Sequence, residues 1–130
     1  MHINSYGDTE KGFLSVVEAH KDISFDIERV YWIHGVPSGG TRGGHAHKKT
    51  RQLFVCVKGA VWVKTLKYFA FEQYADQVQL FSGDAVLIEP MVWHTMKFAE
   101  NSILFVLAST HYDESDYIRD YEVWYSMVTK

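Results

Sequence analysis

The sequence predicts an all-β fold, an antiparallel barrel or sandwich, with one short α-helix at its C-terminal end. Short segments rich in β-branched and aromatic residues recur along the chain and end at turn residues. No helical pattern separates these segments, which favours a barrel or sandwich over a parallel α/β sheet. Only after Asp113 do the apolar residues change to a helical period.

The expected strands follow one another closely. Phe13–Glu18 mixes apolar and small polar residues after the turn at Gly12. Phe25–Glu28 alternates strictly, which is typical of a half-buried strand, and Arg29–Ile33 is rich in β-forming residues. Further strands, each bounded by polar or turn residues, are expected at Leu53–Val57, Val61–Thr65, Tyr68–Phe71, Val78–Phe81, Ala85–Ile88, Trp93–Phe98 and Ser102–Ala108.

The C-terminal segment has the pattern of an amphipathic helix. Four residues fall at positions i, i+4, i+7 and i+11, which form one helical face: Tyr117, Tyr121, Trp124 and Val128. Asp113 or Ser115 is the expected N-cap. We expect this aromatic stripe to pack on the outside of the barrel and to have no role in binding a cofactor.

Length and composition limit the kind of protein. With 130 residues, 47% of them hydrophobic, residues 1–130 are expected to form a single domain. A net charge of −3 offers no concentrated basic surface for nucleic acid. The lone Cys56 excludes an intrachain disulfide and suits a reducing compartment. Because neither a signal peptide nor an apolar run of membrane-spanning length is visible, we expect a cytoplasmic protein without membrane association.

The stretch from residue 39 to 59 carries the residues most suited to chemistry. His45 and His47 are two positions apart, so in an extended segment both imidazoles point to the same face. The glycines before them let the backbone pass close to a ligand. The spacing from Gly39 through both histidines and Gln52 to Gly59 resembles the first motif of the cupin barrels.

A second cupin motif is similar to the stretch from Gly83 through Pro90 to His94, which adds a third histidine. Together the two motifs imply a jelly-roll barrel of the cupin type. Cupin metal sites commonly use a glutamate where this chain has Gln52. We expect Gln52 to hydrogen-bond a neighbouring histidine instead.

The residues alone leave two chemistries open. Zinc can be held by three histidines, although the missing carboxylate makes the site poor for most metals. Without a metal, two adjacent imidazoles can act as acid and base and move a proton between neighbouring carbons. Arg42, three residues before His45, would then hold a phosphate or an oxyanion. We favour the metal-free interpretation.

Longer motifs resemble the sugar-nucleotide 3,4-ketoisomerases. The similar segments are Arg42–Lys49, Gln52, Trp93-His94, Tyr112–Tyr121 and Arg29–Ile33. The resemblance implies a cofactor-free, homodimeric barrel that converts dTDP-4-keto-6-deoxyglucose into its 3-keto isomer through an enediol. It also implies a place before a PLP-dependent aminotransferase, in the synthesis of 3-amino-3,6-dideoxysugars for O-antigen, lipopolysaccharide and other cell-surface glycans.

The resemblance also assigns roles at the site. His45 and His47 are the implied catalytic residues, with His47 as the base at C3 and His45 as a relay. Arg42 would hold the diphosphate and Tyr31 would approach the sugar or the nucleotide. The other implied substrate-binding residues are Lys11, Gln52, Trp93 and His94. No metal ligand is among them.

Some positions depart from the family pattern. Lys11 stands where many members have an arginine, and Thr95 where a glutamate commonly follows the Trp-His pair. The segment Thr65–Gln79 lacks the usual tight Asp-Gly hairpin. His94 together with Lys11 favours a product of the galacto configuration. A metal-dependent cupin enzyme and a sugar-nucleotide-binding module without turnover remain the alternatives.

Overall fold

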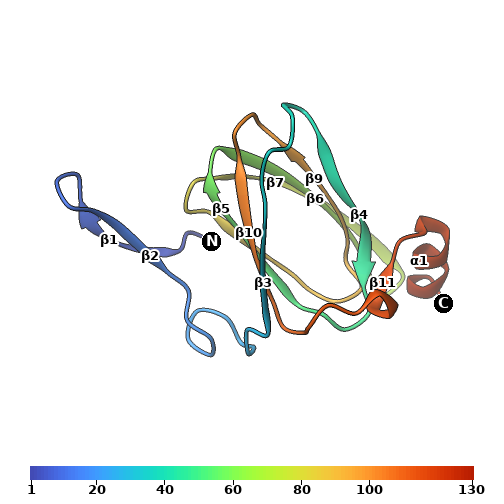
Figure 1. Cartoon of the computed structure of the whole chain (residues 1–130). Coiled ribbons are helices and arrows are strands. Elements are labelled where there is room, and N and C mark those ends of the chain that lie inside the picture. Colours follow the sequence, from blue (N-terminus) through green and yellow to red (C-terminus); the bar gives the residue numbers. More distant parts are fainter.

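The computed structural model describes residues 1–130 and confirms an antiparallel all-β fold with one short C-terminal helix (Figure 1). A single turn of 3₁₀-helix (η1) lies near the C-terminus. The elements, in chain order, are β1 (Asn4–Asp8), β2 (Gly12–Val16), β3 (Arg29–Ile33), β4 (Thr41–His47), β5 (Gln52–Lys58), β6 (Ala60–Phe69), β7 (Glu72–Phe81), β8 (Ala85–Ile88), β9 (Trp93–Phe98), β10 (Ile103–Ala108), η1 (Glu114–Asp116), β11 (Tyr117–Ile118) and α1 (Tyr121–Val128).

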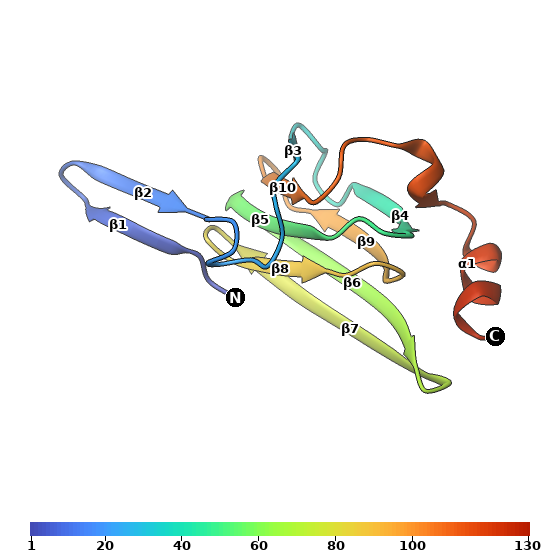
Figure 2. The same ribbon diagram turned by 90° about the horizontal axis from the view of Figure 1, so that it is seen from below.

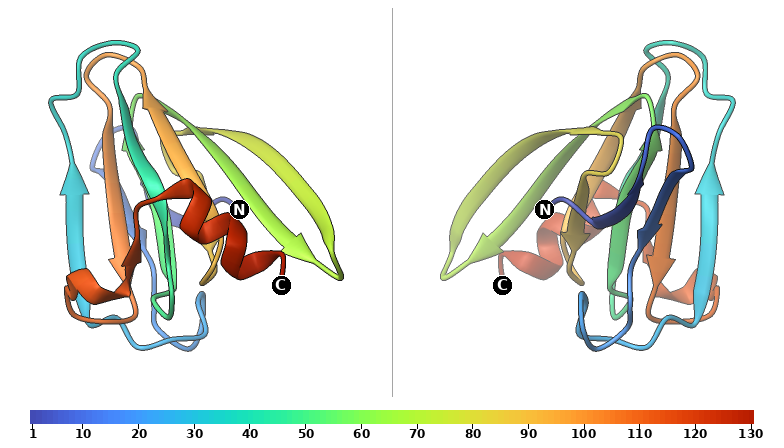
Figure 3. Two further views of the ribbon diagram at one scale, coloured as in Figure 1. Left: turned by 90° about the vertical axis from the view of Figure 1, so that its right-hand side faces the viewer. Right: turned by 90° about the vertical axis from the view of Figure 1, so that its left-hand side faces the viewer.

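Two sheets form the body of the protein. One has four strands in the order β3-β10-β5-β8, and the other has five in the order β11-β4-β9-β6-β7. Every strand pairing in them is antiparallel. Seen from the end, the sheets make two layers that diverge toward the β6–β7 hairpin (Figure 3). Neighbouring strands in sequence therefore often lie in different layers, as the jelly-roll prediction requires.

The main core lies between the two sheets. Side chains at alternate positions of the strands point inward, and ten of them are buried in one cluster: Phe54, Cys56, Val61, Val63, Leu80, Ile88, Met96, Phe98, Leu104 and Val106. Burial of this apolar surface is the main source of stability. The free Cys56 belongs to the cluster, as expected for a small core residue.

The N-terminal segment covers the outer face of the four-stranded sheet. Ile3, Ile23 and Phe25 are buried in a cluster with Leu53 and other residues of this face. The strand predicted at residues 25–28 does not form. The apolar side of that segment packs on the sheet, but its backbone makes a single hydrogen bond to β10, from the Glu28 N–H to the Ala108 carbonyl oxygen, and no strand ladder forms.

The first two strands form a hairpin that extends away from the barrel, on the side opposite α1 (Figure 2). Strand β1 was not predicted because its residues, NSYGD, are mostly polar. The hairpin exposes large apolar side chains, with Phe13 at 65% and Leu14 at 62% exposure.

Strands β6 and β7 form a long hairpin that the sequence did not predict correctly. The strand expected at residues 68–71 is wrong, because β6 continues to Phe69 and the chain then turns through Ala70 and Phe71. These two residues have φ of 53° and 66°, which is the conformation of a tight two-residue turn. The hairpin is therefore tight without the usual Asp-Gly pair.

The C-terminal helix begins later than predicted. Asp113 caps η1, and Tyr117 lies in β11 rather than on a helical face. Helix α1 begins after Asp120, whose side chain accepts hydrogen bonds from the backbone N–H groups of Glu122 and Val123. Trp124 is fully buried against the outer side of the barrel, as expected for the stripe. No helix of the chain is both long enough and apolar enough to cross a membrane.

Trp124→Phe should destabilise the protein. The indole Nε1 donates a hydrogen bond to the carbonyl oxygen of Met91 at 2.8 Å, and the ring fills a closed site. Loss of both should lower the free energy of unfolding by about 1–3 kcal/mol, measured in urea at fixed protein concentration. The matched control is Trp62→Phe, at a partly exposed tryptophan of β6. Equal effects of the two substitutions would contradict the packing described here.

Candidate active site

Strand β4 carries the two predicted catalytic histidines and is paired on both sides. His45 lies opposite His94 of β9, and His47 lies opposite Tyr117 of β11. The register against β9 shifts between Gly43 and His45. Gly43 has a φ of +91°, and a Cβ there would lie 2.9 Å from the carbonyl oxygen of His94. The arrangement therefore depends on glycine at this position.

The three histidines form one cluster. Ring centroids are 4.7 Å apart for His45 and His94, 5.1 Å for His45 and His47, and 6.1 Å for His47 and His94. Three ring nitrogens are buried without a hydrogen-bond partner: Nδ1 of His45, and Nε2 of His47 and of His94. Because an unpaired buried polar atom is costly, these nitrogens mark the place where a ligand would supply partners.

All three imidazoles are held in the neutral form. Burial, followed by the effects of His94 and His47, lowers the pKa of His45 to about 3. Burial lowers the pKa of His94 to about 4, although a hydrogen bond to the Val92 carbonyl opposes the shift. Burial also lowers the pKa of His47, against an opposing effect of Asp116. At neutral pH the cluster can therefore accept protons.

A cavity of about 450 Å³ opens beside the cluster. Its lining comes from β3, β4, β9 and the segment after β10: Arg29, Tyr31, Trp32, Ile33, Arg42, Gly43, His45, His94, Met96, Tyr112, Tyr117 and Arg119. His47 adjoins this wall but does not line it. The lining holds three guanidinium groups and no carboxylate, which suits an anionic ligand such as a diphosphate.

Several residues of the cavity were not predicted individually. Tyr117 lies with its ring centroid 5.0 Å from that of His45 and 4.3 Å from that of His47. The helical period had placed it on a helix, so only the resemblance of residues 112–121 could have pointed to it. Arg119 stacks on the Tyr117 ring at 4.3 Å and is held by an ion pair with Glu114. Arg29 lies over the ring of Tyr31.

Gln52 contacts Tyr31 rather than a histidine, which corrects the expectation from sequence. Its amide Nε2 donates a hydrogen bond to the Tyr31 hydroxyl oxygen at 2.8 Å. Burial raises the pKa of Tyr31 to about 12, so this phenol stays protonated and can donate its own hydrogen to a ligand. Gln52 thus orients Tyr31 at the wall of the cavity.

The histidine cluster has the donors for one divalent cation. A ring nitrogen of each of His45, His47 and His94 lies within 4.8 Å of the others. Neutral imidazoles are suitable ligands for zinc. No carboxylate joins them, because the position of the usual glutamate is taken by Gln52, whose amide contacts Tyr31.

The family model described as FdtA: WxcM-like, C-terminal, matches residues 1–129. The chain belongs to the FdtA family. It is 37% identical to the TDP-4-oxo-6-deoxy-α-D-glucose-3,4-oxoisomerase of Aneurinibacillus thermoaerophilus over 122 residues. The aligned region covers 92% of this chain and 85% of that protein. This agreement confirms the family that the motifs indicated.

Solved structures of sugar 3,4-ketoisomerases have the same fold. QdtA, a sugar 3,4-ketoisomerase from Thermoanaerobacterium thermosaccharolyticum solved with TDP, is 36% identical, with a TM-score of 0.86 over 98% of this chain and 90% of that one. A histidine-to-asparagine variant of QdtA was solved with TDP-4-keto-6-deoxyglucose. A 3,4-ketoisomerase from Helicobacter canadensis is 29% identical, with a TM-score of 0.88 over 99% and 95% of the two chains.

Two predicted residues of this FdtA-family chain are not brought to the cavity. Trp93 and His94 are adjacent on β9, so their side chains point to opposite faces, and Trp93 packs against Tyr121 and Trp124 of the C-terminal helix. Lys11 lies in the turn between β1 and β2, at the end of the hairpin that leaves the barrel (Figure 2). Within one chain, neither residue can contact a ligand at the histidines.

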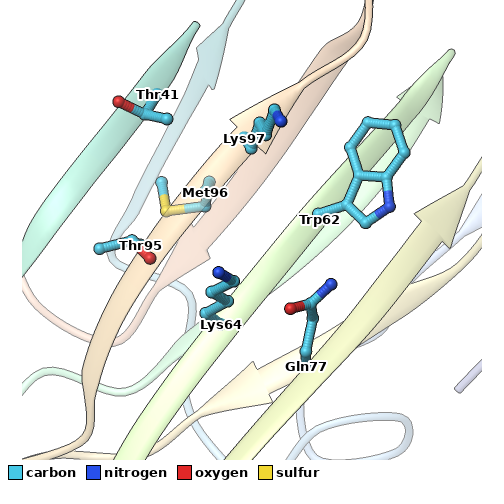
Figure 4. A pocket seen from close by; sticks show the side chains of 7 residues that line it. All are labelled: Thr41, Trp62, Lys64, Gln77, Thr95, Met96 and Lys97. Carbon is cyan, nitrogen blue, oxygen red and sulfur yellow. The ribbon is translucent and has the colours of Figure 1, made fainter. Parts of the chain in front are cut away.

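A separate groove of about 420 Å³ lies on the outer face of the five-stranded sheet (Figure 4). Its lining residues are Thr41, Trp62, Lys64, Gln77, Thr95, Met96 and Lys97. Thr95 and Lys97 alternate with His94 along β9, so the sheet itself separates this groove from the histidine cluster. The groove holds none of the site residues that the resemblance to the 3,4-ketoisomerases assigns.

The stability of this FdtA-family protein should fall with acidification. The unfolded histidines bind protons below a pKa of 6.5, whereas His94 in the folded protein stays neutral to about pH 4. Between these values the unfolded chain binds more protons, so the free energy of unfolding rises with pH. For His94 the slope is about 1.4 kcal/mol per pH unit. His94→Gln should reduce the slope seen in urea unfolding between pH 7 and 5.

The control for this measurement is His34→Gln, at an exposed histidine between β3 and β4 that makes no ion pair. It should leave the slope unchanged. An equal slope in the His94→Gln variant and the unaltered protein would show that His94 is already protonated in this range.

Proposed function

We propose that the chain is a sugar-nucleotide 3,4-ketoisomerase that converts dTDP-4-keto-6-deoxyglucose into the dTDP-3-keto-6-deoxyhexose. The observation that carries the proposal is the cluster of three neutral histidines beside a cavity lined by arginines. It joins a proton acceptor to a site for a diphosphate, which are the two requirements of this reaction. The relatives are named for the same activity.

The proposed reaction relocates two protons, one from C3 to C4 and one from the C3 hydroxyl to the C4 oxygen, with no net gain or loss of atoms. The C4 carbonyl acidifies the C3 hydrogen, a neutral imidazole removes it, and protonation of the C4 oxygen gives an enediol. Loss of the C3 hydroxyl proton and return of a proton to C4 then give the 3-keto sugar. We assign His47 as the base and His45, which lines the cavity next to it, as the relay. The adjacent neutral rings allow both transfers without a cofactor.

The cations of the cavity would hold the nucleotide part. Arg42 lines the cavity and forms no ion pair, so its guanidinium is available to a diphosphate. Arg29 and Arg119 lie on the same wall. Tyr31, oriented by Gln52, would donate a hydrogen bond to the sugar or the nucleotide. His94 would contact the sugar, since its Nε2 has no partner in the protein.

We further propose that the working unit is a homodimer. The β1–β2 hairpin exposes Phe13 and Leu14, and the outer face of β3 exposes Trp32 and Val30. Contact of the hairpin with a second copy would bury these groups and would also bring Lys11 to a second barrel. The finer assignments of a galacto product and a step before an aminotransferase in deoxysugar synthesis belong to the same proposal, supported by His94, Lys11 and the resemblance.

A metal-dependent reaction is the second candidate, because the three histidines have the spacing of a zinc site. In that case the ion would polarise the carbonyl of the substrate in place of a protein acid. The two candidates differ in their response to a chelator.

The direct test is product formation by chelator-treated protein. With dTDP-4-keto-6-deoxyglucose, proton NMR should show the 3-keto sugar, with the small H4–H5 coupling of a galacto product. His47→Asn should reduce turnover by about 10²-fold or more, as for loss of a general base. The exposed His111→Asn should not. Product that appears only after a divalent metal is restored would support the second candidate, and no product in either condition would leave a binding module.

The dimer is tested by light scattering. The unaltered protein should have twice the mass of one chain, and Phe13→Ser with Leu14→Ser should shift it toward the monomer. The control is Phe71→Ser at the tip of the β6–β7 hairpin, where the side chain is even more exposed. A monomeric unaltered protein would contradict the proposal.

A further inference from the structure

Asp116 is a buried charged residue at the end of η1, only 3% exposed. Its Oδ1 accepts a hydrogen bond from the backbone N–H of Lys49 at 2.8 Å, and its Oδ2 accepts one from the Thr50 hydroxyl. Oδ2 is also 3.1 Å from Nδ1 of His47. Thr50 donates to Asp116, so the Thr110 hydroxyl, 2.6 Å away, must donate to Thr50. Both carboxylate oxygens of Asp116 and both threonine hydroxyl groups therefore have partners.

The network keeps Asp116 ionised. Burial alone would raise the pKa of the carboxyl group, but the hydrogen bonds from Thr50, Lys49 and His47 outweigh it and hold the pKa below its usual range. An ionised carboxylate can only accept hydrogen bonds. The hydrogen shared with His47 must therefore be carried by Nδ1 of the imidazole.

We propose that Asp116 is a positioning residue that holds His47 as the Nδ1–H tautomer and leaves its Nε2 lone pair in the space shared by the three histidines. The inference rests on the proposed function and deepens it, because it states why His47 rather than a neighbour is the base. Nε2 of His47 is buried and has no hydrogen-bond partner in the protein. Its lone pair is therefore free to accept a proton from a substrate.

The three histidines differ in what holds them. Nδ1 of His94 donates to a neutral carbonyl oxygen, that of Val92, at 3.1 Å. Nδ1 of His45 has no partner. Only His47 has a carboxylate behind it, and a carboxylate stabilises the imidazolium that forms when the base takes a proton. The same carboxylate prevents the ring from turning its N–H toward the substrate.

A purely structural role is the competing explanation. Asp116 also joins the start of β11 to the segment after β4, through Lys49 and the backbone pairing of Lys48. Loss of these contacts would lower stability without any effect on the tautomer of His47. A test must therefore report on the imidazole itself.

The test is Asp116→Asn, followed by ¹⁵N NMR of the His47 ring and by kinetics. The unaltered protein should show a protonated Nδ1 and an unprotonated Nε2. In the variant the side-chain amide can donate to Nδ1, so the proton should move to Nε2. The kcat should fall about 10²- to 10⁴-fold, as when the aspartate of a catalytic triad is replaced, with little change in KM. Asp113→Asn, an exposed carboxylate of the same turn, should change neither quantity.

The proposal fails if His47 of the unaltered protein carries its proton on Nε2, a result that needs no variant. It also fails if Asp116→Asn lowers kcat as much in a His47→Asn background as alone, because its effect would then not pass through His47. The NMR measurement requires no substrate. Absence of turnover in the unaltered protein would therefore remove the proposed function while leaving the tautomer assignment open to its own test.

Discussion

The double pairing of β4, with β9 on one side and β11 on the other, is the constraint on which the site depends. It sets His45 against His94 and His47 against Tyr117, so four rings from three strands share one space. The bulge next to Gly43 makes this register possible, and no residue with a Cβ fits there without a clash. The short β11, only two residues long, also brings Asp116 to the back of His47.

Burial then determines the chemistry. Burial lowers the pKa of each of the three imidazoles, to about 3 for His45 and about 4 for His94, and so favours their neutral forms. The positive charge of the site is carried instead by the arginines of the cavity wall. Anion binding and proton transfer are thus assigned to different side chains. The arginines can hold an anion while the histidines stay unprotonated.

Much of the fold could be predicted because strand propensity and turn residues are local signals. Strands β8, β9 and β10 could be predicted from their composition. The three histidines could be predicted from the two short motifs. Residues 25–28 and Tyr117 were misassigned for opposite reasons. Residues 25–28 have a strand pattern but only one backbone hydrogen bond to β10. Tyr117 has a helical position but pairs with β4 in a sheet. The secondary structure of these residues depends on tertiary contacts, which the periodicity of the sequence does not reveal.

The hydrogen bonds that orient the residues of the site could not be predicted from local sequence patterns either. Asp116 lies 69 positions from His47, and Gln52 lies 21 positions from Tyr31, so only the assembled barrel joins these pairs. The placement of Lys11, far from the histidines of its own chain, likewise follows from the direction of the first hairpin (Figure 2).

Solvent exchange would show whether the neutral histidines move a proton between C3 and C4. Chelator-treated protein would be mixed with dTDP-4-keto-6-deoxyglucose in deuterated water and followed by proton NMR. We expect deuterium at C4 of the 3-keto product and exchange at C3 of the recovered substrate, both dependent on His47. Product formation and deuterium incorporation that continue at an unchanged rate in His47→Asn would contradict this expectation.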